Sequence, residues 1–481
     1  MEAVIRAIDT EKDPRCLLVA FDCVRHLAAL YPPLGTANPD ADAEQWTELH
    51  SCIACYFPIA YHPPRGMPEA VTRAELVSGL EAALASHPRF APHTVPLLLE
   101  KAASPSQRDM DDSMSGLVAC CVAWGEAMMG DHIEEVWRML ELHLAGEDDA
   151  DAERAARCLK LCCRALSQDK GEGGKEEPPL GALHRRALDD GLWTGWMTSL
   201  QELAAQPGTP STSAIAKTAA QAEHSCRALA AVGGSSPQAC RAALNMTLPI
   251  LMDTAMGQRF LQGMGPSPAA AAACRGIALT SLKTMVNSAH ELVAFECTKH
   301  GRAPQPPPLG DYAKELAATA AYFDEAEDNA LDTEPSISIM RLQLLGVLLN
   351  TPAGTPPALA SPSMDALVER LLSIIESAAP APSEPASEPQ TQPGKEPQSL
   401  EDAPGLACTI LQHSAATLRG CPAYGAALPR LLAAVASHTE SMEEGEGEGT
   451  LPCWRGAWPL RALLSMSESD PGFRAGAVAG L

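Results

Sequence analysis

Aromatic residues are scarce in this sequence, where Phe, Trp and Tyr together make up 4% of 481 residues. β-sheets draw on aromatic and β-branched side chains, which pack well on a pleated surface. Here Ala and Leu dominate the apolar residues, which account for 46% of the chain. The composition therefore argues against a β-rich fold and predicts an all-α protein.

Long apolar segments are also missing. Nowhere do about eighteen uncharged apolar residues run together, as a membrane-spanning helix requires. The stretch from Met1 to Asp9 lacks the apolar core of a signal peptide. We therefore expect a soluble intracellular chain with no membrane partner. Its 16 cysteines are expected to be reduced thiols, because they are scattered through predicted helices of a long chain without a secretory signal.

Basic residues are far fewer than acidic residues. The chain has 35 Lys and Arg residues against 60 Asp and Glu residues, which gives a net charge of −25. Such a chain repels phosphate backbones, and no cluster of Lys and Arg forms a local exception. Direct binding to nucleic acid is therefore disfavoured.

Catalytic motifs are absent from the sequence. It contains no Gly-x-Ser-x-Gly elbow, no His-Glu-x-x-His pair and no Gly-x-x-x-x-Gly-Lys-Ser/Thr loop. We therefore predict a protein that is not an enzyme, with no catalytic residues and no cofactor.

The sequence is rich in capped amphipathic helices. Asp13 followed by Pro14 is typical of a helix start, because the carboxylate caps free amides and Pro needs no donor in the first turn. Thr72 and Glu75 have the spacing of a capping box. Apolar residues then recur at spacings of three and four, so that each helix has one apolar face. Two such stripes are Ile133, Val136, Trp137, Leu140 and Leu144, then Ala155, Cys158, Leu159, Cys162 and Leu166.

These helices follow one another in pairs that cannot bury their apolar faces alone. Pairs of this kind are the unit of HEAT-like and armadillo-like α-solenoids, with a compact helical bundle as the alternative. We expect antiparallel helix pairs with disordered Pro- and Glu-rich linkers. The predicted segments are repeats at 1–166, a linker at 167–180, repeats at 181–300, a Pro-rich break at 301–310, repeats at 311–379, a disordered linker at 380–400, and short helical pairs at 401–481 with an acidic Gly-rich linker at 441–449.

Several short strings near the start resemble a known family. They are Asp13-Pro14-Arg15 with the following Leu-Leu-Val-Ala-Phe, Cys55-Tyr56-Phe57-Pro58-Ile59, Leu84-Ala85-Ser86, Pro88-Arg89-Phe90-Ala91, Leu97-Leu98-Leu99-Glu100-Lys101 and Ala119-Cys120-Cys121. In this order and spacing they resemble the N-terminal region of the MMS-nineteen DNA repair proteins, over about residues 4–166. From 181 onward only helical pattern and composition are shared.

The resemblance implies a non-catalytic HEAT-repeat scaffold of the cytosolic iron-sulfur protein assembly complex, working in nucleus and cytoplasm. Its implied partners are other subunits of that complex and iron-sulfur apoproteins such as DNA helicases, polymerases and primase. Family members also have further repeats before the segment that corresponds to Met1 and a long C-terminal solenoid. Neither is recognisable here, so we expect a truncated member or one whose C-terminal portion has diverged.

Two groups of residues are candidate sites. Cys52 and Cys55 have the C-x-x-C spacing of metal and redox sites, although a full site needs a second pair, such as Cys120-Cys121 or Cys162-Cys163. The alternative is small thiols packed inside helices. Tyr56, Phe57 and Tyr61 are candidate partner-binding residues in a loop between helices, or rings that close the core there.

Three functions remain open at this stage. The first is the iron-sulfur adaptor that the resemblance implies. The second is a generic HEAT-repeat interaction or transport adaptor without an iron-sulfur role, because a fold does not fix a function. The third is a thiol or metal enzyme built around Cys52 and Cys55.

The acidic run from Glu147 to Asp149 either attracts basic partners or is a solvated turn that favours the next helix start.

Overall fold

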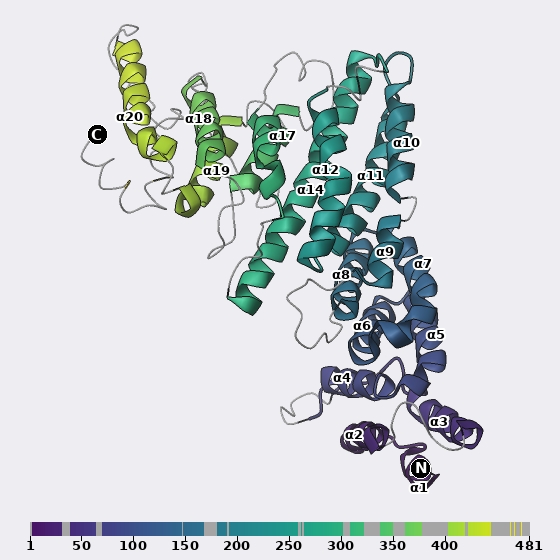
Figure 1. Cartoon of the computed structure of the whole chain (residues 1–481). Helices are drawn as coiled ribbons and strands as arrows, with labels where there is room; N and C mark the ends of the chain where they lie inside the picture. The colour runs from purple at the N-terminus through teal and green to yellow at the C-terminus, as the bar shows by residue number, and fades with distance from the viewer. Residues whose placement is uncertain are drawn as a thin grey trace. The chain divides into compact units, whose positions relative to one another are not determined.

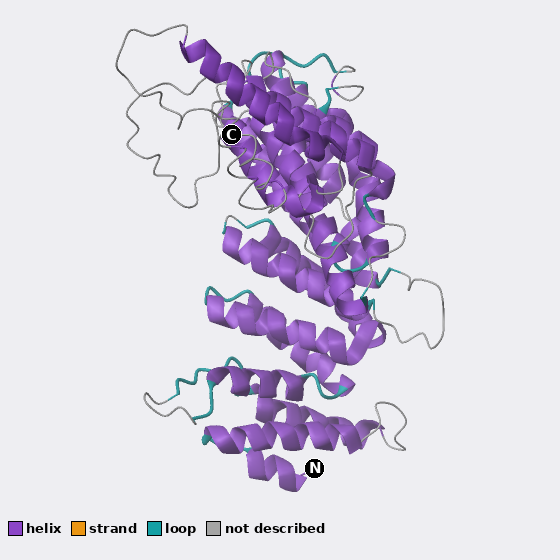
Figure 2. Ribbon diagram, turned by 90° about the vertical axis from the view of Figure 1, so that its left-hand side faces the viewer, coloured by secondary structure: helices purple, strands orange, loops and turns teal. Residues whose placement is uncertain are grey.

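The structure is a computed structural model of the whole chain (Figure 1). It describes residues 2–30, 39–63, 70–146, 148–167, 180–189, 192–257, 261, 264–301, 308–321, 337–349, 361–377, 403–418 and 422–443, with the single residues 462, 466 and 473. Within these ranges all regular structure is helical and no strand occurs (Figure 2). The prediction of an all-α protein is confirmed. The described residues include no helix that is long and apolar enough to cross a membrane.

The chain divides into two compact units. Unit 1 comprises residues 1–193 and 227–239, and unit 2 comprises residues 194–226 and 240–481. The helices of unit 1 are α1 (Glu2–Ile8), α2 (Pro14–Leu30), α3 (Pro39–Ala54), α4 (Arg73–Leu84), α5 (Ala91–Ala102), α6 (Gln107–Met129), α7 (Ile133–Leu144), α8 (Asp149–Leu166) and α9 (Ala182–Asp189), with short 3-10 turns η1 (Pro88–Phe90) and η2 (Gly130–His132).

The helices that follow belong mainly to unit 2. They are α10 (Leu192–Ala204), α11 (Thr212–Gly233), α12 (Pro237–Ala255), α14 (Pro268–His300), α15 (Ala313–Ala321), α17 (Ile337–Leu349), α18 (Ser361–Ser377), α19 (Ala403–Leu418) and α20 (Pro422–Glu443), with the 3-10 turn η3 (Gly310–Tyr312). The C-terminal end of α11 and the start of α12 lie in unit 1.

Helices pack in two rows in each unit. In unit 1, α2, α4, α6 and α8 contact one another in order along one row, and α3, α5, α7 and α9 do so along the other. In unit 2 the rows are α14, α17 and α19, and α15, α18 and α20. Contact between helices that are next but one in sequence is the packing of an α-solenoid, in which each pair buries its apolar face against its neighbours. The HEAT/armadillo-like architecture is therefore confirmed.

Local sequence signals fix several helix starts. The Asp13 carboxylate accepts a hydrogen bond from the Arg15 amide at 2.8 Å, at the start of α2. Thr72 and Glu75 form the predicted capping box of α4, each side chain bonding the backbone amide of the other. Asp148 accepts from the Ala150 and Asp151 amides and caps α8. This acidic turn thus supports a helix start, as one of the two interpretations predicts, whereas Glu147 lies outside the described residues.

The predicted apolar stripes form the core of unit 1. All five residues of the stripe on α7 and all five of the stripe on α8 are buried, and Trp137 is fully buried. α6 contacts α8 and α7 contacts α8, so the two rows share this core. Within α6 the backbone leaves the helical conformation at Gly125, whose φ is +66°. A positive φ favours glycine because it has no Cβ, and the bend lets the chain turn towards α7.

Some elements differ from the sequence-based expectation. The short helix α1 was not anticipated, because seven residues carry too little periodicity to be recognised. The repeats expected at 181–300 begin with two short helices, α9 and α10. Most of the expected linkers, namely residues 168–179, 302–307, 380–400 and 444–449, lie outside the described residues, as does most of 451–481.

Candidate functional site

The candidate site lies at the end of α3 and in the loop that follows, residues 55–63, which we call the aromatic loop. Cys55 is exposed, Tyr56 and Tyr61 are partly exposed, and Phe57 is buried. The Phe57–Pro58 peptide bond is cis. Phe57 and Ile59 belong to the core of unit 1, so the loop sends alternate side chains into the protein.

Tyr56 ties the aromatic loop to the turn between α1 and α2. Its hydroxyl donates a hydrogen bond to the Glu11 carbonyl at 2.9 Å. Its ring meets Phe21 of α2 edge-on, with 6.0 Å between the ring centroids. Burial raises the pKa of the Tyr56 hydroxyl, so it remains a donor at neutral pH. These contacts fit the interpretation of rings that close the core between helix pairs, and they leave Tyr61 and Cys55 as the more accessible side chains.

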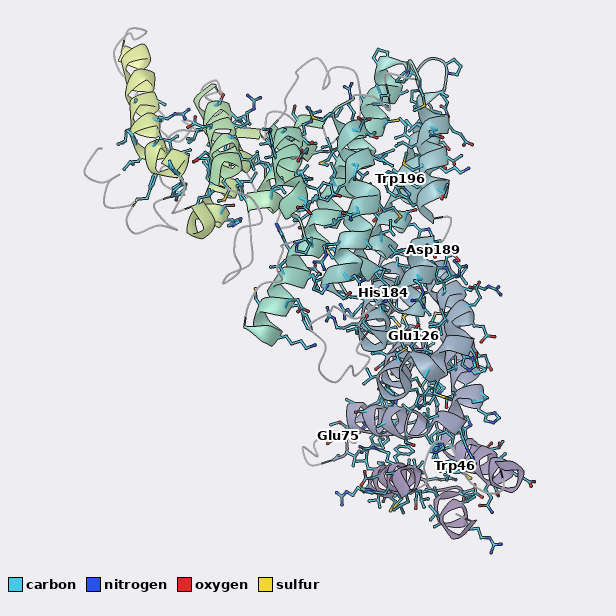
Figure 3. The ribbon with its side chains drawn as sticks, in the orientation of Figure 1. Trp46, Glu75, Glu126, His184, Asp189 and Trp196 are labelled. Carbon is cyan, nitrogen blue, oxygen red and sulfur yellow. The ribbon has the colours of Figure 1, made fainter. Side chains whose placement is uncertain are left out.

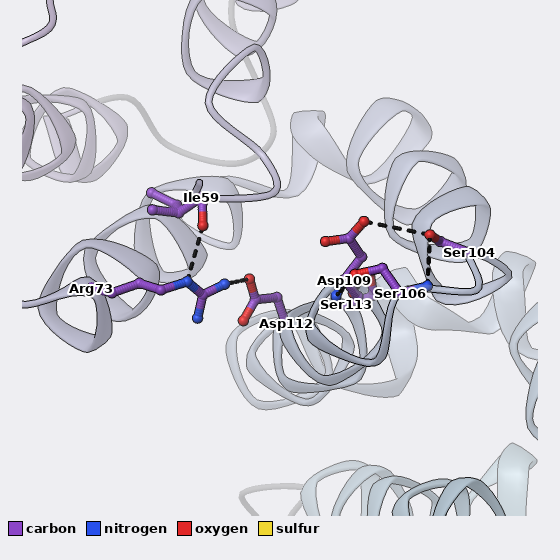
Figure 4. Close-up of polar contacts among 7 residues, drawn as sticks. All are labelled: Ile59, Arg73, Ser104, Ser106, Asp109, Asp112 and Ser113. Atoms are coloured by element: carbon purple, nitrogen blue, oxygen red, sulfur yellow. Dashed lines mark hydrogen bonds and ion pairs between the residues drawn. The ribbon is translucent and has the colours of Figure 1, made fainter. Parts of the chain in front are cut away.

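Arg73 holds the middle of the aromatic loop (Figure 4). Its Nε donates to the Ile59 carbonyl at 3.0 Å, and its guanidinium also pairs with the Asp112 carboxylate on α6. The Asp112 side chain is only 7% exposed. Burial raises the pKa of Asp112, and the Arg73 guanidinium opposes that rise. One side chain therefore connects the loop, α4 and α6.

A second carboxyl group lies in the same space between α4 and α6. Burial raises the pKa of Glu81 to about 7, while a hydrogen bond from Ser115 acts in the opposite direction. Its Oε1 atom is buried and makes no hydrogen bond to the described residues. Arg73, Glu81 and Asp112 thus form a charged cluster, in which the guanidinium pairs with Asp112 and its charge also acts to lower the pKa of Glu81. This cluster was not predicted from the sequence, because Asp112 lies on another helix and Arg73 and Glu81 are two turns apart on α4.

The two candidate metal ligands lie at the C-terminal end of α3. The Cys55 thiol donates to the Cys52 carbonyl at 3.2 Å. Burial raises the pKa of both thiols, and the nearby Asp9 carboxylate adds to the effect. Since the thiolate is the metal ligand and the nucleophile, both activities are weakened. No group of three or more His, Cys, Asp or Glu residues that is able to hold a metal occurs in the described ranges.

The other cysteine pairs lie on α6 and α8, in the core. Cys120 and Cys121 are on α6, and Cys162 and Cys163 on α8, all of them buried. The Cys158 and Cys162 sulfur atoms are 3.9 Å apart. Hydrogen bonds to the Cys121 and Cys158 thiols, together with burial, raise the pKa of Cys162 well above its usual value. These thiols therefore pack as small side chains between the two helices.

Sequence reasoning missed a cluster of rings that joins α3 to η1 and α5. Trp46, labelled in Figure 3, stacks on His87 with ring centroids 4.0 Å apart. Trp46 also meets Phe90 edge-on at 5.5 Å. His50 Nε2 lies 3.1 Å from the Thr94 hydroxyl, and burial lowers the pKa of His50 to about 4. The only signal in the sequence was the spacing of Trp46 and His50 by four residues, which places them on one helix face.

A serine and histidine group near α9 resembles a hydrolase site only superficially. His184 Nε2 lies 2.8 Å from the Ser235 hydroxyl and 3.3 Å from the Ser167 hydroxyl, and burial lowers the pKa of His184 to about 4 (Figure 3). Its Nδ1 atom has no hydrogen-bond partner among the described residues. A catalytic triad needs a carboxylate at that atom to orient the imidazole and stabilise its charged form. The group therefore links α8, α9 and the end of α11 and lacks the catalytic arrangement.

Comparison with known proteins gives matches for the N-terminal region. Residues 1–145 match the family model MMS19_N, described as a Dos2-interacting transcription regulator of RNA-Pol-II. The MMS19 nucleotide excision repair protein homolog of Homo sapiens is 36% identical over 159 residues, which are 33% of this chain and 15% of that protein. The homolog of Arabidopsis thaliana is 36% identical over 140 residues, covering 29% of this chain and 12% of that protein.

Among solved structures, the matches include an importin-β and a karyopherin. Yeast importin-β (Kap95p) aligns with 100% of this chain and 58% of its own, at 13% identity and a TM-score of 0.25. The karyopherin Kap121p, bound to the extreme C-terminus of the protein phosphatase Cdc14p, aligns with 99% of this chain and 46% of its own, at 10% identity and a TM-score of 0.28.

The sequence matches cover the same N-terminal residues as the short strings that resemble the MMS-nineteen family. The matched part of this chain spans about 15% of the length of the vertebrate relatives. It contains the aromatic loop, the Arg73 bridge and the α7 stripe, all within the residues that match the family model. The N-terminal region of this chain is therefore related in sequence to the MMS19 nucleotide excision repair proteins, as the strings between residues 4 and 166 predicted.

Proposed function

We propose that this protein is a non-catalytic adaptor of the cytosolic iron-sulfur protein assembly complex. In this role it holds apoproteins of DNA metabolism while clusters are inserted, and so serves nucleotide excision repair, replication and TFIIH-dependent transcription. The observation that carries the proposal is the 36% identity of its N-terminal region to the human MMS19 nucleotide excision repair protein homolog over 159 residues. The transcription regulator named in the family description supports the same area of function.

The physical properties of the chain support an indirect role in DNA repair. A net charge of −25 opposes contact with phosphate backbones, so we place its function in protein partners and not in DNA. The stacked helix pairs provide extended surfaces of the kind that repeat proteins use for binding. We propose that its partners are the other subunits of the assembly complex and apoproteins such as DNA helicases, polymerases and primase, in nucleus and cytoplasm.

The test is native affinity purification of the tagged full chain, followed by mass spectrometry of the retained proteins. We expect subunits of the assembly complex together with cluster-containing helicases or polymerases. A membrane-permeant iron chelator should increase the recovery of these clients, because an adaptor of this kind binds them before they receive a cluster. Recovery of transport or cytoskeletal proteins alone, unaffected by chelation, would contradict the proposal and favour a generic repeat adaptor.

A pair of matched variants tests whether the aromatic loop takes part. Tyr61→Ala removes a partly exposed ring from the loop, whereas Leu142→Ala removes an exposed apolar side chain from α7 in the same unit. Neither residue belongs to the buried core, so both variants should fold. If the loop contacts a partner, recovery of that partner falls for Tyr61→Ala and not for Leu142→Ala. Equal recovery of the partner by both variants would show that the aromatic loop is not part of the interface.

A further inference from the structure

A groove lies on the face of unit 2 formed by α11, α14 and α17, with a volume of about 440 Å³. Residues of all three helices line it, and α14 packs directly against α17. This volume falls within the range of roughly 300–1,000 Å³ that is usual for binding sites in proteins. None of the residues that line it belongs to the aromatic loop or to the charged cluster of unit 1.

The groove exists because the middle helix has small residues on this face. Ala272, Ala273 and Gly276 line it on α14, while Ile215 of α11 and Met340 of α17 line its sides. A Cβ atom at Gly276 would lie 3.3 Å from the Met340 sulfur, so a glycine at this position lets α17 lie close to α14. The small side chains of α14 leave the space over this face open between α11 and α17.

The lining of the groove favours an apolar occupant. The hydroxyls of Thr280, Ser281 and Thr284 donate to carbonyls four residues earlier in α14, at 2.9–3.2 Å. Their hydrogen bonds are thus made within the helix. Small polar ligands usually need several convergent polar groups to fix their orientation, and this lining offers few.

The length of the groove favours a helix as its occupant. On α11 the lining residues run from Thr212 to Cys226, a rise of about 21 Å at ~1.5 Å per residue. On α14 they run from Ala272 to Thr284, a rise of about 18 Å. A helix of about 12–14 residues has the same length, and its apolar residues at i, i+3, i+4 and i+7 make one stripe.

Charge indicates the chemistry of that helix. Glu223 is the only Asp, Glu, Lys, Arg or His among the described residues that line the groove, and it is exposed. The whole chain has a net charge of −25. We propose that the groove binds an amphipathic helix of a partner protein, whose apolar stripe lies over α14 and whose Lys or Arg pairs with Glu223. This inference stands independently of the proposed iron-sulfur role.

The test measures binding of designed helical peptides to the full chain by fluorescence anisotropy. One 14-residue peptide has Leu at i, i+3, i+4 and i+7 with Lys beside the stripe, and a second has Glu in place of that Lys. We expect the Lys peptide to bind about two- to fivefold more tightly, which is the contribution of an exposed ion pair. In the variant Glu223→Lys this preference should reverse. An unchanged preference would overturn the role of Glu223.

A matched pair of Trp variants tests the groove itself. Ala216 is exposed and lines the groove, whereas Ala220 is exposed on the same helix and does not line it. Ala216→Trp should weaken binding of the Lys peptide about tenfold or more, because the Trp ring fills the space that a Leu side chain of the bound peptide would occupy. Ala220→Trp should leave binding unchanged, with the same circular dichroism spectrum. Equal binding by both variants would overturn the proposal, as would self-association of the chain that Ala216→Trp alone abolishes.

Discussion

Glu81 provides a test of the charged cluster between α4 and α6, because its ionisation should weaken that contact. In the folded protein burial raises the pKa of Glu81 to about 7, from the ordinary value of 4.5. The contribution of this group to stability is therefore fully present below about pH 4.5 and is lost as the pH rises through about 7. The variant Glu81→Gln has no carboxyl group at this position and should not show the loss.

The size of the effect follows from the difference between the two pKa values. A difference between 4.5 and about 7 corresponds to roughly 3.4 kcal/mol, at ~1.4 kcal/mol for each pH unit. Because the side chain is only partly buried, solvent screening reduces this to about 1–2 kcal/mol. That free energy changes the equilibrium constant for local opening by about 5- to 30-fold.

Hydrogen exchange of the amides of α4 and α6 measures this local opening. At each pH the exchange rate of the natural chain is divided by that of Glu81→Gln, so that the intrinsic dependence of exchange on pH cancels. We expect this ratio to rise about 5- to 30-fold between pH 5 and pH 8. The control variant Glu100→Gln, with a carboxyl group that is 70% exposed on α5, should give a constant ratio. A constant ratio for Glu81→Gln would refute the reasoning.

Three further predictions concern packing, capping and metal binding. Trp137→Ala should lower the free energy of unfolding by about 3–5 kcal/mol, because the ring is fully buried. The control Leu142→Ala, an exposed position on the same helix, should change this free energy by less than ~0.5 kcal/mol. Urea unfolding followed by circular dichroism measures both values. Thr72→Ala should cost about 1 kcal/mol of stability by the same assay, because it removes the N-cap of α4. Replacing Cys52 and Cys55 by Ser should leave the metal content of the purified protein unchanged by mass spectrometry of the elements, and loss of a bound metal would contradict the packing interpretation.

Much of the fold was predictable because helix faces follow a short period. The stripe around Trp137 could be read from spacings of three and four, since a helix that must bury one face repeats every 3.6 residues. The capping box at Thr72 was equally visible, because both partners lie within one turn. Such signals depend only on neighbours in the sequence.

The candidate site was less predictable because its contacts join distant residues. Arg73 and Asp112 are 39 residues apart, and nothing in either local sequence indicates that they pair. The same is true of Trp46 and His87, which stack only because α3 packs against η1. For the aromatic loop the sequence indicated Tyr56, Phe57 and Tyr61 as candidates and left open which of these side chains face the core. The structure turns Phe57 inward and leaves Tyr61 partly exposed.

The buried thiols of α6 and α8 allow the separation of these two helices to be detected by chemical labelling. Cys120, Cys162 and Cys163 are buried, and their pKa values lie well above the usual value for a thiol. The thiolate is the form that attacks an alkylating reagent, so these residues react only when their helices separate and water enters. Exposed Cys16, Cys23 and Cys55 are accessible without such opening. Pulsed alkylation of the natural sequence, read peptide by peptide by mass spectrometry, therefore measures how often α6 and α8 separate, with no introduced label.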